Sequence, residues 1–151
     1  MHTPTGPESH RLASAPVADE IEFLLARART IGILKANSAL AEFDLKVRHY
    51  VVLSLAVGEL APSQRELAEF LHLDPSQIVA TIDVLESRGW VERTPSPDDR
   101  RIKVLGATPA GVAVYEQIRE AVGAAEDASL ATLTPAERNT LRELLHRIAF
   151  V

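Results

Sequence analysis

The chain of 151 residues contains no cysteine, which excludes disulfide bonds, cysteine-ligated zinc and redox sensing through a thiol. It also has no apolar run near the roughly 18–20 residues that a membrane-spanning helix needs. Residues 1–16 are rich in Pro, Ser, Thr and His and lack the apolar centre of a secretory signal. We therefore expect a soluble, cytoplasmic protein with no membrane partner and a disordered N-terminal tail over residues 1–18.

Motifs of common catalytic and metal sites are missing as well. The sequence has no glycine-rich phosphate loop and no nucleophile elbow. The neighbouring carboxylates Asp98 and Asp99 belong to a turn-rich loop, where no pocket would shield a reaction from water. We therefore expect no enzyme activity, no metal and no cofactor. Metal-ligand spacing is absent among the five histidines, which are His2, His10, His49, His72 and His146.

Basic residues are outnumbered overall but are concentrated in one segment. The formal net charge of −5 is unfavourable for a nucleic-acid-binding protein, because contacts with phosphates require Lys and Arg. Residues 88–103 nevertheless hold five basic and three acidic side chains, a local charge of +2. The basic residues are Arg88, Arg93, Arg100, Arg101 and Lys103.

Hydrophobic periodicity predicts long helices at both ends of the chain. Apolar residues recur at helical spacing over 19–42, and a helix this long suggests packing beyond its own subunit. Residues 46–60 are apolar almost all round, which predicts a buried helix. Near the other end, helices are expected over 109–128 and from Pro135 onward, where Thr134 opens a capping box.

Capping signals in the middle of the chain predict two short helices joined by a tight turn. Ser63 opens a capping box that begins a helix over 64–71. Asp74, followed by a proline, is a favourable N-cap for the next helix, which should run to about Arg88.

A hairpin is expected directly after these helices. Gly89 suits a helix C-cap, and short strands follow near 91–94 and 103–105. The Pro-Ser-Pro-Asp-Asp run between them cannot be helical and extends the hairpin outward, with Arg100 and Arg101 at its far end. Helix, turn, helix and a basic-tipped hairpin is the layout of a winged helix-turn-helix, a DNA-binding unit.

The second short helix has an unusual outer face. Ile78, Ile82 and Leu85 share one side and should form the core stripe. A solvated outer face normally carries Lys, Glu and Arg, whereas this one is small and partly apolar, as suits insertion into a major groove. Ser and Gln exchange hydrogen bonds with base edges, and Ala or Val contacts a thymine methyl. The alternative is that this face packs on a neighbouring element. Its residues are Ser76, Gln77, Ala80, Asp83, Val84 and Ser87.

The arginines of the hairpin tip suit a narrow minor groove, whose negative potential attracts them. Asp99 should hold Arg101 in position through a charge-assisted hydrogen bond. The alternative is an ordinary solvated cluster of charges on a loop.

These motifs resemble the MarR family of bacterial transcriptional regulators, over about residues 19–151. They are Gln64-Arg-Glu-Leu-Ala68, Pro75-Ser76, Leu85-Glu-Ser-Arg-Gly-Trp90, Asp99-Arg-Arg and Thr108-Pro-Ala-Gly111. The resemblance implies a mostly α fold with a small β wing. In it, a winged helix-turn-helix domain (46–107) is flanked by dimerisation helices (19–45 and 108–151).

The resemblance also implies a homodimer that binds a pseudo-palindrome in double-stranded DNA, more often as a repressor. By the family's pattern Arg101 enters the minor groove. Two departures are the alanine at position 80, where many members carry a basic residue, and the stretch 106–108, expected to loosen the return of the wing. The candidate DNA contacts are Gln64, Arg65, Ser76, Gln77, Ala80, Thr81, Asp99, Arg100, Arg101 and Lys103.

Members of the family commonly bind small phenolic or aromatic acids between the dimer helices and the winged domain, which changes the spacing of the two DNA-binding heads. Arg48 would pair with a carboxylate, and His49 or Tyr50 would hydrogen-bond a phenol or acid. The alternative is that His49 and Tyr50 are satisfied residues at the edge of the core and that Arg48 is solvated. The candidate effector residues are Asn37, Arg48, His49, Tyr50 and Tyr115.

A second function stays open from the sequence. The net negative charge and the apolar residues on the outer helix face also fit a winged-helix module that contacts another protein without specific DNA recognition.

Overall fold

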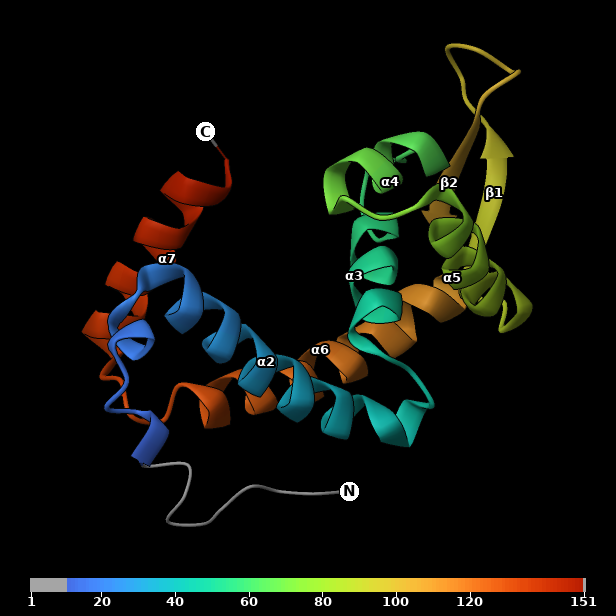
Figure 1. The fold of residues 1–151 in the computed structure, drawn as a ribbon. Helices are drawn as coiled ribbons and strands as arrows, with labels where there is room; N and C mark the ends of the chain where they lie inside the picture. Colours follow the sequence, from blue (N-terminus) through green and yellow to red (C-terminus); the bar gives the residue numbers. More distant parts are fainter. Residues whose placement is uncertain (1–10, 151) are drawn as a thin grey trace.

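The computed structural model describes residues 11–150, which form helices and one two-stranded sheet (Figure 1). The 3-10 helices are η1 (Pro16–Asp19) and η2 (Ala41–Phe43). The α-helices and strands are α2 (Ile21–Leu40), α3 (Val47–Ala56), α4 (Gln64–Leu71), α5 (Pro75–Ser87), β1 (Val91–Pro95), β2 (Lys103–Ala107), α6 (Pro109–Ser129) and α7 (Pro135–Ala149).

The fold has two parts that α6 connects. The long helices α2 and α6 lie side by side, with α7 at one end of the pair, and α3 to β2 form the winged part at the other end (Figure 1). The hairpin of β1 and β2 projects away from the long helices (Figure 1). The predicted mostly α fold with a small wing is confirmed.

The core lies mainly in the winged part. The predicted stripe on α5 is confirmed, because Ile78, Ile82 and Leu85 are all fully buried. Around them pack buried side chains from α3, α4, both strands and α6, namely Val52, Leu53, Leu67, Val91, Leu105 and Ile118. The core therefore holds α5 by one side and leaves its opposite side exposed.

Side-chain caps begin the helices where the sequence predicts them. The Ser63 hydroxyl accepts from the Glu66 N–H, and the Glu66 carboxylate accepts from the Ser63 N–H at 2.7 Å. Asp74 accepts from the Ser76 N–H at 2.8 Å at the start of α5. Gly89 follows α5 with φ +69°, the left-handed conformation that glycine adopts at least cost.

The hairpin is antiparallel and slightly longer than predicted, with Val91 opposite Ala107 and Pro95 opposite Lys103. The backbone before α4 pairs with the outer side of β2 over a very short length. Ser63 forms a β-bridge with Val104, and the Leu105 N–H donates to the Pro62 carbonyl at 2.8 Å. This bridge, which the sequence did not predict, ties the first short helix to the wing.

The expected loosening at the end of the wing is wrong. The strand stays paired through Ala107, and the Thr108 N–H donates to the Trp90 carbonyl at 3.0 Å. The Thr108 hydroxyl donates to the Gly89 carbonyl and accepts from the Gly111 N–H. Thr108 thus closes the hairpin and caps α6.

Three predicted boundaries differ from the structure. The helix expected over 46–60 ends at Ala56, because Val57 is already extended and Gly58 has φ +119°. The first helix ends at Leu40, where η2 and a left-handed turn replace its last predicted residues. Of the predicted disordered tail, residues 1–10 lie outside the described part, whereas Pro16–Asp19 is the 3-10 helix η1. Within residues 11–150 no helix has the length and apolar character needed to cross a membrane.

Candidate nucleic-acid interface

One side of α5 is open to solvent along its whole length. Ser76, Gln77, Ala80 and Asp83 are exposed there, and Val84 is half-buried. The Ser76 hydroxyl donates to the Asp74 carboxylate at 2.5 Å, so the exposed oxygen can still act as an acceptor. We call Ser76, Gln77, Ala80 and Val84 the recognition face.

Thr81 does not belong to this face, although the sequence suggested it as a DNA contact. Its side chain is buried at 2% exposure, and its hydroxyl donates to the Gln77 carbonyl one turn earlier. A threonine placed this way supports the helix and has no polar atom left for a base or phosphate. We therefore remove Thr81 from the candidate interface.

Arg93 on β1 joins the wing to both short helices. Its guanidinium pairs with Asp83 at 2.5 Å and with Glu86, both on α5, and donates to the Gln64 side-chain oxygen at 2.7 Å. The two acids lie three residues apart and so share one side of the helix. This spacing in the sequence could have indicated that the two acids share one internal cationic partner. The single Arg93 charge offsets one of the two acids beside the recognition face, and its hydrogen bond to Gln64 positions that side chain.

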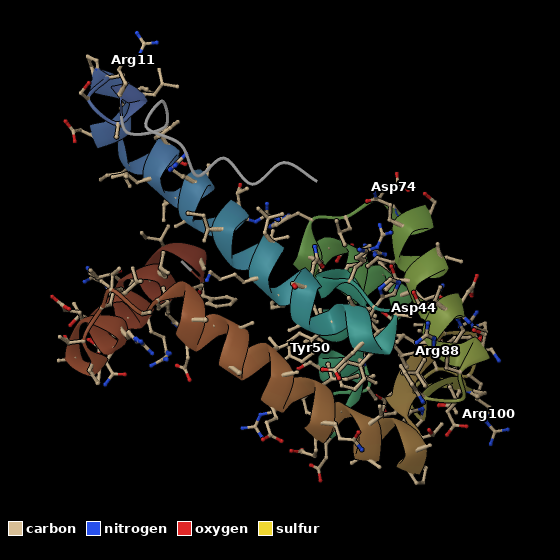
Figure 2. The ribbon with its side chains drawn as sticks, turned by 90° about the horizontal axis from the view of Figure 1, so that it is seen from below. Arg11, Asp44, Tyr50, Asp74, Arg88 and Arg100 are labelled. Carbon is tan, nitrogen blue, oxygen red and sulfur yellow. The ribbon has the colours of Figure 1, made fainter. Side chains whose placement is uncertain are left out.

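Arg88 is likewise engaged inside the fold. Its guanidinium donates to the Phe43 carbonyl at 2.6 Å and to the Asp44 carboxylate at 3.0 Å, and it lies 5.1 Å from the centre of the Trp90 ring. Figure 2 shows Arg88 and Asp44 close together. These contacts anchor the end of α5 to the turn after η2.

The five basic side chains of residues 88–103 therefore do not form one exposed positive patch. Two of its five basic side chains serve internal contacts, and the three outward-facing ones, Arg100, Arg101 and Lys103, belong to the wing. Figure 2 shows Arg100 at the outer edge of the molecule. The exposed cations of this segment thus lie at the wing tip and not beside α5.

The predicted contact between Asp99 and Arg101 is confirmed. The Asp99 carboxylate accepts from the Arg101 backbone N–H at 3.0 Å and from its guanidinium at 3.2 Å and 3.4 Å. These hydrogen bonds, the backbone one first, hold the pKa of the Asp99 carboxyl below its ordinary value. Arg101 remains 91% exposed while it is held. The wing tip thus presents an oriented cation.

At the start of α4, Arg65 pairs with Glu69 at 2.7 Å, one turn along the same exposed side. Such an exposed pair contributes little to stability. Arg65 therefore stays a candidate phosphate contact.

The structure separates the five candidate effector residues into different surroundings. Asn37 accepts from the Val47 N–H at 2.9 Å, and the His49 ring accepts from the Lys46 N–H at 3.0 Å. Both side chains cap the first turn of α3. Burial, with the charge of Arg48 adding to it, lowers the pKa of His49. The alternative that His49 is a satisfied residue at the core edge is confirmed.

Tyr50 and Tyr115 form the aromatic part of that set. Their rings stack with centres 6.0 Å apart, and the Tyr115 hydroxyl lies 3.2 Å from the Ser54 hydroxyl. Burial, with the nearby Tyr115 adding to it, raises the pKa of Tyr50. Tyr50 borders a hollow of about 620 Å³ along α6, which Arg119 and Glu116 also line. Figure 2 shows Tyr50 beside α6. We call this space the tyrosine hollow.

Arg48 and His49 border a different hollow of about 320 Å³, whose other wall is α5. Residues two apart on a helix point in nearly opposite directions, so Arg48 and Tyr50 cannot meet one small ligand from the same side. That spacing was visible in the sequence. We call this space the recognition hollow; its α5 residues are Ser76, Gln77, Ala80, Thr81 and Val84. Among residues 11–150, no three His, Asp or Glu side chains are placed to hold a metal ion.

Comparison with known proteins connects this geometry to one group of regulators. The family model described as "MarR family" matches residues 45–103. A putative transcriptional regulatory protein for the hcr operon of Thauera aromatica is 31% identical, over 96% of this chain and 88% of that protein.

Two solved structures extend the similarity to the terminal helices. A MarR-family transcriptional regulator from Rhodococcus sp. RHA1 is 39% identical with a TM-score of 0.83, covering 91% of this chain and 97% of that one. CouR from Rhodococcus jostii RHA1, bound to p-coumaroyl-CoA, is 38% identical with a TM-score of 0.78, covering 91% and 96%.

Proposed function

This chain belongs to the MarR family of transcriptional regulators, and we propose that it is a homodimeric repressor that binds a specific operator sequence. Each protomer inserts the recognition face of α5 into a major groove and the wing arginine into the adjacent minor groove. A two-fold dimer then requires a pseudo-palindromic site. An aromatic effector releases the DNA.

The oriented wing arginine carries this proposal. Arg101 is exposed and held by the Asp99 carboxylate, so little side-chain entropy is lost when it enters a groove. The recognition face on α5 carries small, uncharged side chains, and the acid on the same side of the helix, Asp83, is paired with Arg93. A helix of that kind approaches base edges closely.

The dimer is supported by apolar surface on the terminal helices. None of the residues of α7 is buried within the protomer. A groove of about 850 Å³ between α2, α6 and α7 is lined largely by apolar side chains, among them Leu25, Leu130, Leu141 and Leu145. A second copy of the chain would cover this surface.

The tyrosine hollow is the proposed effector site. Tyr50 borders it with an aromatic ring, which Tyr115 backs by stacking on it. Arg119 is its one lining cation among residues 11–150; it pairs with Glu116 at 3.5 Å, and a ligand carboxylate or phosphate would have to replace that pair beside Glu120 and Glu126. The similar protein CouR binds p-coumaroyl-CoA, so we propose an aromatic acid or its coenzyme A thioester as the effector. Tyr50 belongs to α3, which also borders the recognition hollow. A ligand that shifts α3 would therefore displace α5.

The test of DNA recognition is fluorescence anisotropy with the DNA upstream of the gene and with a scrambled duplex. We expect binding to the upstream DNA to be about a thousandfold tighter. Arg101→Ala should weaken it by about tenfold or more, since an oriented groove contact is lost. Arg27→Ala, which removes an exposed charge from α2, should not. Equal affinity of the wild-type protein for both duplexes would contradict the proposal and favour the protein-contact alternative.

The effector is tested by adding p-coumaroyl-CoA, free p-coumarate or coenzyme A to the DNA complex. Release by the thioester or the free acid, but not by coenzyme A alone, is the expected result. Tyr50→Ala should blunt that release while leaving DNA affinity in place. If none of the three compounds releases the DNA, the proposed effector class is wrong.

A further inference from the structure

The recognition helix has no positive charge of its own. Between Pro75 and Ser87 there is no Lys or Arg, while Asp83 and Glu86 are acidic. The neighbouring Arg93 pairs with both acids, and its single positive charge offsets only one of their two negative charges. A helix inserted between two rows of phosphates would thus meet them without a cation of its own.

A cation from another helix borders the same space. Arg48, in the first turn of α3, is exposed and lines the recognition hollow opposite Ser76, Gln77 and Ala80. The small side chain of Ala80 contributes to the open space there. Within residues 11–150, Arg48 has no ion pair or side-chain hydrogen bond. Its charge is therefore available to a ligand.

The dimensions of DNA place a phosphate near this position. The major groove is about 12 Å wide, and a helix with its side chains is about 10–12 Å across. When α5 fills the groove, the sugar-phosphate backbone runs along both of its flanks. An exposed arginine on a helix packed beside α5 then lies next to a phosphate.

We propose that Arg48 is a DNA-contacting residue that binds a backbone phosphate from α3 and supplies the cation that α5 lacks. This assignment rests on the proposed DNA-binding function and replaces the effector role that the sequence suggested for Arg48. Because a phosphate carries no base identity, the contact sets affinity and register rather than sequence preference.

The experiment titrates wild-type protein, Arg48→Ala, Arg48→Lys and the control Arg27→Ala with upstream and scrambled duplexes across a range of salt concentrations. Arg48→Ala should weaken binding to both duplexes about fivefold at physiological salt and reduce the slope of log K against log salt by about 1. Arg48→Lys should keep the wild-type slope, since it keeps the charge. Arg27→Ala should match the wild type, and circular dichroism should show that all variants are folded.

Two results would overturn the assignment. One is an Arg48→Ala protein with the affinity and salt slope of the wild type. The other is a loss confined to the upstream duplex with an unchanged slope, which would mean that Arg48 contacts a base. The proposed function is tested separately, by the wild-type preference between the two duplexes, so failure of either idea is distinguishable.

Discussion

At the scale of single residues, the junction between the wing and α6 depends on a glycine. Gly111 is buried, and a Cβ built on it would lie 1.8 Å from the Trp90 carbonyl oxygen. That carbonyl also accepts the Thr108 N–H and cannot move freely. Only a residue without a side chain allows α6 to begin so close to the hairpin.

We predict that Gly111→Ala lowers the free energy of unfolding by about 1–3 kcal/mol through this overlap, measured by urea denaturation. The matched control is Gly123→Ala in the same helix, where an added Cβ meets nothing within 4 Å. It should be neutral or stabilising by up to about 1 kcal/mol, because alanine favours a helix. Equal effects of the two substitutions would contradict the overlap.

His49 gives the stability a pH dependence. Folding lowers the pKa of His49 below the ordinary 6.5, chiefly by burial. As the pH falls, His49 is therefore protonated more readily in the unfolded chain than in the folded one. Its contribution to stability is therefore complete above about pH 6.5 and is lost as the pH falls through the folded pKa.

We predict that the free energy of unfolding decreases between about pH 7.5 and about pH 5.5 more in the wild type than in His49→Asn. Asparagine keeps an acceptor for the Lys46 N–H but does not titrate. The measurement is urea denaturation of both proteins at the two pH values. Parallel pH dependence would show that His49 is not the source.

At the scale of elements, an aromatic contact joins the residue after α7 to the winged part. The rings of Phe70 on α4 and Phe150, directly after α7, stack with centres 6.1 Å apart, and His146 lies 4.8 Å from Phe150. Phe70 and Phe150 are otherwise largely exposed. This stack connects the terminal helices to the first helix of the helix-turn-helix.

We predict a coupling of about 0.5–1.5 kcal/mol between these rings, measured by a double-mutant cycle of Phe70→Ala and Phe150→Ala in chemical denaturation. Hydrogen exchange in α4 should rise in either single variant, because α4 loses a support. Strictly additive effects of the two substitutions would mean that the stack does not contribute.

At the scale of the whole molecule, the terminal helices have too much apolar surface for a lone protomer. Ile21 and Leu34 on α2 are 71% and 62% exposed, and Ile148 on α7 is 65% exposed. Each such side chain gains about 1.5–3 kcal/mol when it is fully buried. The proposed association of two protomers would bury them.

We predict that the wild type sediments as a dimer and that the double variant Ile21→Glu with Ile148→Glu shifts toward monomer, because buried unpaired charges are costly. Leu60→Glu is the control, since Leu60 is 81% exposed on the loop before α4, away from these helices. Analytical ultracentrifugation over a range of concentrations measures the shift. A wild-type monomer, or a control that dissociates equally, would contradict the proposed interface.

The sequence by itself determined the elements and most of their boundaries. Caps such as Ser63 with Glu66, and the core stripe of α5, depend on residues three or four positions apart, so they are visible in the chain. The contact of Asp99 with Arg101 is equally local. For this reason the winged layout and the wing tip could be predicted.

The tertiary structure alone decided which charged groups remain free. Arg88 is held by a carbonyl 45 residues earlier, and Arg93 also donates to a side chain 29 residues earlier. No local pattern encodes these two contacts, although the spacing of Asp83 and Glu86 indicated an ion pair. The same packing buried Thr81 and set Arg48 beside α5 while Tyr50 borders α6. The physical reason is that the core determines which distant segments lie together and therefore which partners a charged group has. Composition gives only the number of arginines and not which of them are paired.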